Sequence, residues 1–109
     1  MEVNKAVPVQ LLDSINYQPN AVVSSEIISQ PTGSVTIFAF DKGQGLSEHT
    51  APFDALVYIL DGQAQITISQ KSQIVKAGEI IIMPAHQPHS LHAEQPFKML
   101  LVMIKTKQN

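Results

Sequence analysis

The most constraining feature of this chain is a succession of short apolar runs, rich in β-branched and aromatic residues, between residues 21 and 104. Gly, Pro and Asp separate the runs, and their spacing of about 8–12 residues is typical of an all-β sandwich or barrel. Pro84, Pro88 and Pro96 exclude a long helix in the last third. The runs that we predict to be strands are 21–29, 34–40, 55–60, 64–69, 72–76, 79–83, 89–93 and 97–104.

Local signals between the runs predict the turns and one short helix. Asp61 and Gly62 stand between two runs and predict a two-residue hairpin, because both central residues of a type I′ turn need a positive φ. The segment 8–14 begins with a proline and continues with apolar residues, which allows one short helix ahead of the strands. No repeat or linker divides the chain, so we expect a single domain over residues 1–109.

The composition excludes several kinds of function. The chain has no cysteine, which excludes a disulfide framework, a thiolate metal site and a cysteine nucleophile. It has no arginine and a net charge of -2, so it lacks the cationic clusters that bind nucleic acid. The first residues carry no basic region followed by an apolar one, and no run approaches the roughly 18 apolar residues of a membrane span. We expect a cytoplasmic protein without nucleic-acid or membrane partners.

Two strands are more apolar than a single small barrel requires. The runs 79–83 and 97–104 are almost continuously apolar, which is typical of strands covered on both faces or packed against a partner subunit. Leu100, Val102 and Ile104 share one parity and point outward, which indicates an interface. We therefore expect a homodimer. Lys98 is predicted to be an outward strand residue.

Histidine is the residue type best suited here to metal binding or proton transfer at neutral pH. His86, His89 and His92 lie close together in the sequence, but the neighbouring prolines disfavour a helix that would align them. In a strand over 89–93, the period of two places His89 and His92 on opposite faces. A common site therefore needs one of these two together with a distant residue, and His49 is the only distant imidazole.

Two segments of the chain resemble the two sequence motifs of the cupin family. The first is 45–62, GLSEHTAPFDALVYILDG, which resembles G-x5-H-x-H-x3,4-E-x6-G. The second lies within 78–93 and begins GEIIIMPAHQPH, which resembles G-x5-P-x-G-x2-H. The resemblance implies a small single-domain cupin, an all-β double-stranded β-helix or jelly-roll barrel of the RmlC-like kind.

The resemblance extends to only part of the family's metal site. His49 falls on the first histidine of the first motif and His89 on the histidine of the second, which implies an interior pair. Ala51 and Ala55 stand where the family has its second histidine and its glutamate. His86 replaces the usual glycine of the second motif. Two of the four metal-ligand positions are thus retained.

The retained histidines allow two interpretations. Cupins typically hold iron, manganese, zinc or nickel, so one interpretation is a divalent metal bound weakly by His49 and His89, with His92, Asp54 or Glu48 as a third donor. The other is a pair of polar residues in an inherited cavity, hydrogen-bonded to each other or to water, with no ion. His86 and His92 are predicted to be a turn residue and an outward surface residue.

The resemblance leaves more than one function open. We expect a barrel pocket centred on the two histidines that binds a small organic ligand, lined by apolar side chains from among Phe38, Phe40, Met83 and Met99. The alternative is a metal-dependent cupin enzyme of the oxygenase or isomerase type. A third hypothesis is a structural domain that assembles through its outer strands.

Overall fold

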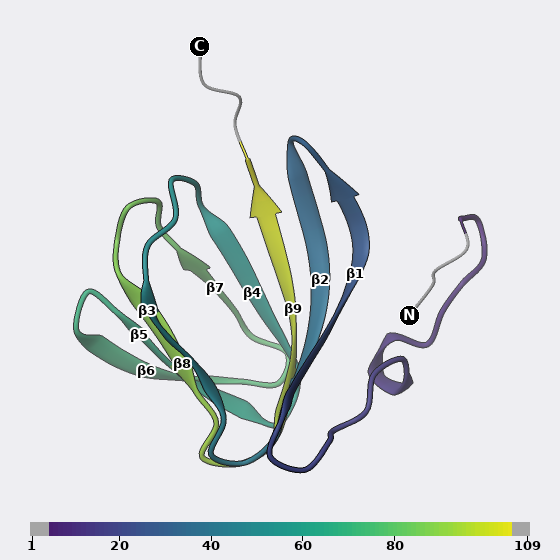
Figure 1. Cartoon of the computed structure of the whole chain (residues 1–109), viewed down its shortest axis with the longest axis horizontal. Helices are drawn as coiled ribbons and strands as arrows, with labels where there is room; N and C mark the ends of the chain where they lie inside the picture. The colour runs from purple at the N-terminus through teal and green to yellow at the C-terminus, as the bar shows by residue number, and fades with distance from the viewer. Residues whose placement is uncertain (1–4, 106–109) are drawn as a thin grey trace.

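The protein is described by a computed structural model over residues 5–105, so four residues at each end of the predicted domain lie outside the described residues. Two antiparallel sheets face each other and open like a V (Figure 1). The strands are β1 (Val22–Gln30), β2 (Gly33–Phe40), β3 (Gly45–His49), β4 (Ala55–Asp61), β5 (Gln63–Ile68), β6 (Lys71–Lys76), β7 (Ile80–Met83), β8 (His89–His92) and β9 (Phe97–Ile104). The order of strands is β1-β2-β9-β4-β7 in one sheet and β3-β8-β5-β6 in the other. This arrangement confirms the predicted all-β fold.

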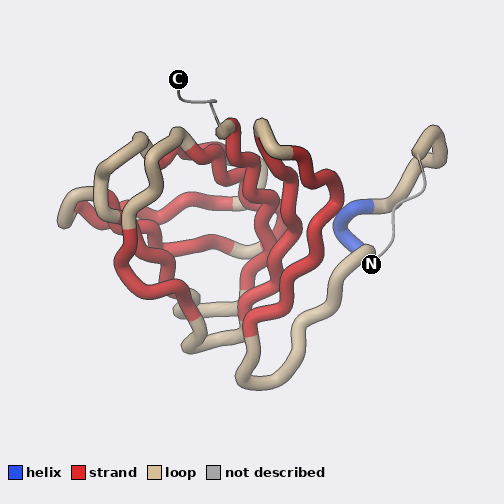
Figure 2. The backbone as a smooth tube through the Cα atoms, turned by 45° about the horizontal axis from the view of Figure 1, so that its top comes forward, coloured by secondary structure: helices blue, strands red, loops and turns tan. Residues whose placement is uncertain are grey.

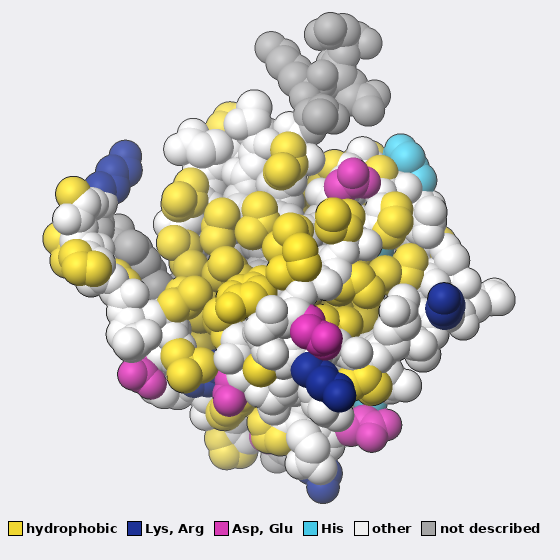
Figure 3. All heavy atoms as spheres, turned by 180° about the vertical axis from the view of Figure 1, so that it is seen from behind, with side chains coloured by type: hydrophobic (Ala, Val, Ile, Leu, Met, Phe, Trp, Pro, Cys, Tyr) yellow, Lys and Arg dark blue, Asp and Glu magenta, His cyan; other side chains and the backbone are white. Residues whose placement is uncertain are grey.

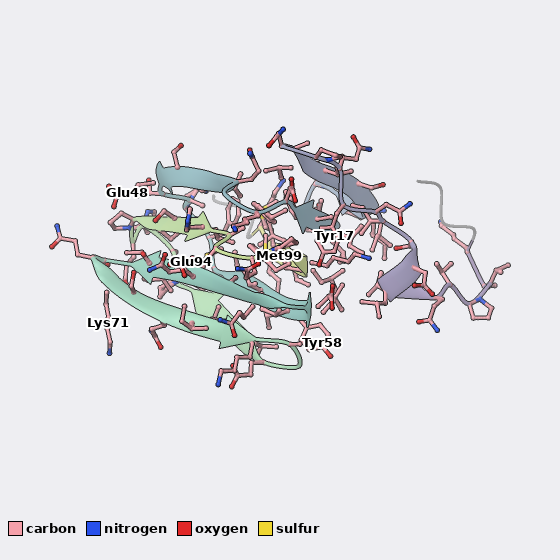
Figure 4. All side chains as sticks on the ribbon, turned by 90° about the horizontal axis from the view of Figure 1, so that it is seen from below. Tyr17, Glu48, Tyr58, Lys71, Glu94 and Met99 are labelled. Atoms are coloured by element: carbon pink, nitrogen blue, oxygen red, sulfur yellow. The ribbon has the colours of Figure 1, made fainter. Side chains whose placement is uncertain are left out.

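The core lies between the two sheets, where the alternation of side chains directs apolar residues from both inner faces. Val57 of β4 and Met99 of β9 come from one sheet, and Ile66 of β5 comes from the other; all three are fully buried. Figure 4 shows Met99 between the two layers, whereas Glu48 and Lys71 lie at the periphery. Phe40 stacks on Phe97 at a centroid distance of 4.4 Å. Burial of these side chains is the main force that holds the sheets together.

Each of the eight predicted runs overlaps one strand, and one further strand was not predicted. The strand β3 is an edge strand that pairs only with β8. Its residues are mostly exposed and three of its five are the polar Ser47, Glu48 and His49. A pattern of apolar runs cannot detect such a strand, because its hydrogen bonds to β8 rather than its burial hold it in place.

The predicted hairpin at Asp61 and Gly62 is wrong. The strand before Gly62, β4, belongs to the five-stranded sheet, and the strand after it, β5, belongs to the four-stranded sheet, so the chain turns a corner between layers. Gly62 has φ +72°, and an added Cβ would lie 2.4 Å from the carbonyl oxygen of Pro96. The tight hairpin is instead β5–β6, where Ser69 and Gln70 both have positive φ.

The N-terminal segment covers part of the outer face of the five-stranded sheet (Figure 2). The predicted short helix is a single 3-10 turn, η1 (Leu11–Asp13). Behind it, Ile15 packs on Ile37 and Ala39. Lys98 points out of the barrel, as predicted, but it is buried under this segment and its Nζ donates to the Leu12 carbonyl oxygen at 2.8 Å. Among residues 5–105 no helix is long and apolar enough to cross a membrane.

The outer face is covered by the chain only in part. Leu100 contacts the N-terminal segment, whereas Val102 lies outside that cluster and Ile104 is exposed. Ile80 and Ile82 of β7 are also exposed, so residues 5–105 cover only one face of this strand. The expectation of a strand enclosed on both faces is therefore not met within a single copy.

Candidate functional site

The structure brings together the two histidines that fall on the cupin motifs. His49 ends β3, His89 begins β8, and these residues are register partners in the antiparallel pair. Their Nε2 atoms lie 3.1 Å apart, and the rings meet edge to face at a centroid distance of 4.3 Å. Residues 40 positions apart in the sequence thus form one polar site at the inner face of the four-stranded sheet.

Backbone carbonyl groups hold both rings. The Nδ1 atom of His49 lies 2.7 Å from the carbonyl oxygen of Ser47, and that of His89 lies 3.2 Å from the carbonyl oxygen of Gln87. A carbonyl oxygen only accepts hydrogen bonds, so each Nδ1 must be the donor. In two neutral rings the Nε2 atoms then both bear lone pairs. The pair consequently presents two acceptors that face each other and lack a donor between them.

Burial keeps His89 in its neutral form. Its side chain is 4% exposed, and this burial lowers its pKa from the ordinary value because the charged form loses its hydration. The carbonyl of Gln87 acts in the opposite direction, and the positive charge that His49 can carry lowers the pKa further. At neutral pH the Nε2 atom of His89 is therefore an acceptor or a ligand atom rather than an acid.

A small apolar cavity opens beside the histidines. It has a volume of about 60 Å³. One water needs about 15 Å³ on this measure, so the cavity has room for roughly four non-hydrogen atoms. Pockets for drug-sized molecules are several times larger, about 300–1,000 Å³. The lining residues are Leu46, His49, Ala51, Phe53, Ala55, Met83, His89, Leu91, Met99, Leu101 and Met103.

The predicted lining is only partly the observed one. Met83 and Met99 line the cavity, as expected. Phe38 and Phe40 do not; they stack on each other at a centroid distance of 5.7 Å. Met103 was missed, although it shares its parity with Met99 in the strand and so points to the same face. The cavity is thus lined by thioethers, aliphatic groups and the Phe53 ring around the histidine pair.

The other candidate donors lie elsewhere. Asp54 accepts the backbone N–H of Ala85 with its Oδ1 at 2.8 Å and does not line the cavity. His92 is exposed and lies on the opposite face of β8 from His89, as strand parity predicts. Glu48 is exposed. Within residues 5–105 no group of three or more histidine and carboxylate side chains is placed to hold a metal ion.

Alanines occupy the two remaining ligand positions of the motif. Ala51 and Ala55 both line the cavity. Ala55 lies between Met83 of β7 and Met103 of β9, which are its register partners on the two sides. Where the family has a carboxylate, this chain therefore has a methyl group between two thioethers. The four-ligand centre of the family does not fit these residues, because only two donors are present.

His86 stands where the motif has a glycine, and its backbone adopts a conformation that is typical of glycine. Its φ is +68°, a left-handed conformation that glycine adopts without strain. Its N–H donates to the carbonyl oxygen of Ala51 at 2.7 Å, which ties the turn before β8 to the loop after β3. The prediction of a turn residue is confirmed.

Comparison with known proteins identifies the family. Residues 36–104 match the family model described as a cupin domain. A conserved protein of unknown function from Streptococcus pyogenes is 36% identical, with a TM-score of 0.91, and the match covers 97% of this chain and 93% of that one. A search of curated proteins returned no match.

Two further solved structures agree in fold. A cupin 2 conserved barrel domain protein from Leptotrichia buccalis is 41% identical with a TM-score of 0.87; the match covers 89% of this chain and 47% of that one. A cupin superfamily protein from Desulfitobacterium hafniense is 26% identical with a TM-score of 0.89, over 95% of both chains. The motif residues, the two-layered barrel and these matches together place the chain in the cupin family.

Proposed function

We propose that this cupin binds a small organic ligand in the cavity beside His49 and His89. The observation that carries the proposal is the histidine pair beside the apolar cavity, with the Nε2 atoms of the buried His89 and the exposed His49 3.1 Å apart. A hydroxyl or amine hydrogen of a ligand supplies the missing donor. His89 is buried, and leaving its acceptor without a donor is costly, so a ligand that donates a hydrogen bond gains more here than one that only accepts.

The size and charge of the site limit the ligand further. About 60 Å³ admits roughly four non-hydrogen atoms, so the whole of a very small molecule or one end of a larger one enters. Among residues 5–105 no lysine lines the cavity, and the chain has no arginine for a bidentate clamp on an anion. The ligand class is therefore a neutral, mostly apolar group with one hydrogen-bond donor.

A pair of fragments of equal size tests this proposal. 2-Propanol and acetone both have about four non-hydrogen atoms, but only the alcohol donates a hydrogen bond. Methyl-labelled methionine gives one NMR signal for each of the four methionines, three of which line the cavity. We expect 2-propanol to shift the signals of Met83, Met99 and Met103 at millimolar concentration, and acetone to shift them less.

Two variants provide the controls. His49→Ala removes one acceptor and should abolish the preference for the alcohol. His92→Ala removes an exposed histidine away from the cavity and should leave the preference unchanged. Equal shifts with both fragments, or no shift with either, would contradict the proposal.

The same histidines favour a second candidate, a metal-dependent enzyme of the oxygenase or isomerase type. Metal-ligating histidines usually donate their other ring N–H to a carbonyl group, as both rings do here. Two nitrogens each about 2.1 Å from one ion stand roughly 3.0–3.4 Å apart, a range that includes the 3.1 Å observed. A zinc, nickel, iron or manganese ion would polarise a substrate oxygen. It would need its remaining ligands from water or substrate.

Elemental analysis separates the two candidates. Protein purified without a histidine tag should contain about one divalent ion per chain if the second candidate holds, and His49→Ala should lose it. A metal-free protein that still prefers 2-propanol to acetone would leave only the first candidate. The metal content and the fragment preference are independent measurements, so each candidate can fail alone.

A further inference from the structure

Three of the four methionines in the chain line the cavity beside the histidine pair. Met83 ends β7, and Met99 and Met103 lie on β9. Met83 and Met103 flank Ala55 in the five-stranded sheet as its register partners. Methionines in a protein core usually fill irregular gaps, whereas these three surround a space that is left open. The reactivity of the thioether, rather than its packing, then distinguishes this lining.

The exposed surface does not share this chemistry. Figure 3 shows hydrophobic side chains gathered over one face of the molecule. Among residues 5–105 the large hydrophobic side chains that are exposed are all valine, leucine or isoleucine. Such aliphatic groups are inert to peroxides, whereas a thioether is oxidised to a sulfoxide. Within the described part of the chain, every thioether thus lies at the cavity.

The cavity matches a small hydroperoxide in size and in hydrogen bonding. A hydroperoxide is a neutral molecule whose terminal O–H donates a hydrogen bond. Hydrogen peroxide and methyl hydroperoxide are both smaller than the roughly four non-hydrogen atoms that about 60 Å³ admits. The Nε2 atoms of His49 and His89 are the acceptors for this hydrogen, and these two residues have the only polar side chains of the lining. The other atoms of the hydroperoxide then contact apolar groups and thioethers.

We propose that the cavity binds a small hydroperoxide and that Met103 takes one oxygen atom from it to become methionine sulfoxide. The inference rests on the proposed function, because it names the hydrogen-bond donor that the histidine pair receives. Met103 is half-buried, whereas Met83 and Met99 are 3% and 0% exposed. The thioether of Met103 is therefore the most accessible of the three.

The transfer is a two-electron reaction that balances without a further reactant. A sulfur lone pair of Met103 attacks the terminal oxygen of the hydroperoxide, so that a sulfur–oxygen bond forms and the oxygen–oxygen bond breaks. The bonding electrons leave with the second oxygen, which takes the proton of the transferred oxygen and departs as water or an alcohol. The sulfur is oxidised and the peroxide is reduced, so each sulfoxide formed consumes one hydroperoxide. The histidine pair contributes by holding the terminal O–H, which fixes the oxygen that is transferred.

Peptide mass spectrometry of the full-length protein tests the inference. The protein is treated with hydrogen peroxide in the presence of EDTA, because a bound redox metal would oxidise nearby methionines by another route. N-acetylmethionine in the same solution serves as the reference. We expect Met103 to be oxidised at least about 10-fold faster than the reference, because the hydrogen bonds of the pair hold the peroxide beside it. tert-Butyl hydroperoxide is too bulky for the cavity and should show no such acceleration.

His49→Ala distinguishes the inference from simple exposure of the sulfur. The substitution removes one acceptor from the cavity lining and at the same time widens access to the thioethers. The inference expects Met103 to be oxidised about 10-fold more slowly in this variant, whereas exposure alone would make its oxidation faster. His92→Ala removes an exposed histidine away from the cavity and should leave the rate unchanged.

Two results would overturn the inference: oxidation of Met103 no faster than that of the reference, and a rate that rises in His49→Ala. If 2-propanol still shifts the methionine signals in either case, the cavity binds hydrogen-bond donors without reacting with peroxides, and the proposed function stands. Slow oxidation together with no shift by either fragment would refute both.

Discussion

At the scale of single residues, the hydrogen-bonding capacity of the site depends on which ring nitrogens of the histidines are already bonded to the backbone. Ser47 and Gln87 each use a carbonyl oxygen to hold the Nδ1 atom of a histidine. The imidazole rings therefore cannot turn to exchange their nitrogens without losing a hydrogen bond. Their free Nε2 atoms are directed at each other and toward the cavity. This fixed orientation turns two ordinary histidines into one acceptor pair.

The pH dependence of stability should follow from the lowered pKa of His89. The unfolded chain binds a proton at this residue near pH 6.5, whereas the folded chain binds it only at lower pH. The folded state is therefore favoured above pH 6.5, and this contribution is lost as the pH falls from 7 toward the folded pKa. Urea denaturation should show the free energy of unfolding falling over this range.

Two variants isolate the contribution of His89. His89→Gln should flatten the dependence between pH 7 and the folded pKa, because the titrating group is gone. His92→Gln, at an exposed position of the same strand, should retain it. A flat profile in the wild-type protein would contradict the assignment.

His86 should limit stability through its backbone conformation. With φ +68°, His86→Gly removes the strain of a left-handed side chain and preserves the N–H donated to Ala51. Relief of this strain should raise the free energy of unfolding by about 1 kcal/mol. The greater entropy of glycine in the unfolded chain offsets part of this gain. Glu94→Gly, in a loop without positive φ, should lower it. A loss of stability in His86→Gly would mean that the imidazole makes a contact worth more than the strain.

At the scale of elements, the corners of the barrel were harder to predict than its strands. The eight apolar runs were found because burial imposes a pattern on the sequence. A corner at Gly62 and a hairpin there both need a positive φ, so the same Asp-Gly signal fits either structure. Which of the two forms is determined by how the flanking strands pair with distant strands. Ser69 and Gln70 turn the true hairpin without a glycine, held by the pairing of the strands around them.

Gly62 and Gly43 should therefore differ in their response to the same substitution. Gly43→Ala, with φ +85° and open space around the new Cβ, should lower the free energy of unfolding by about 1–2 kcal/mol. Gly62→Ala meets the carbonyl oxygen of Pro96 as well and should lower it by a further 1–3 kcal/mol, roughly. Urea denaturation of both variants measures the difference. Equal losses would mean that the 95–97 loop moves aside freely.

At the scale of the whole molecule, the two faces of the five-stranded sheet have different surroundings. Along β9, Met99 and Met103 line the cavity, whereas Val102 has the opposite parity and lies on the outer face. The sequence alone predicted apolar residues on both faces of this strand, and the motif spacing predicted the histidine pair. It could not predict that the N-terminal segment covers only part of the outer face, because that segment has no strand periodicity.

The strand β9 carries the cavity on one face and the N-terminal segment on the other. Met99 lines the cavity, and the next residue in the sequence before it, Lys98, donates to the Leu12 carbonyl oxygen. Thermodynamic reciprocity applies to any coupling across this strand: if a ligand in the cavity strengthens the docking of the segment by some factor, the docked segment must strengthen ligand binding by the same factor. Removing the segment would in that case change the affinity of a site that it does not touch.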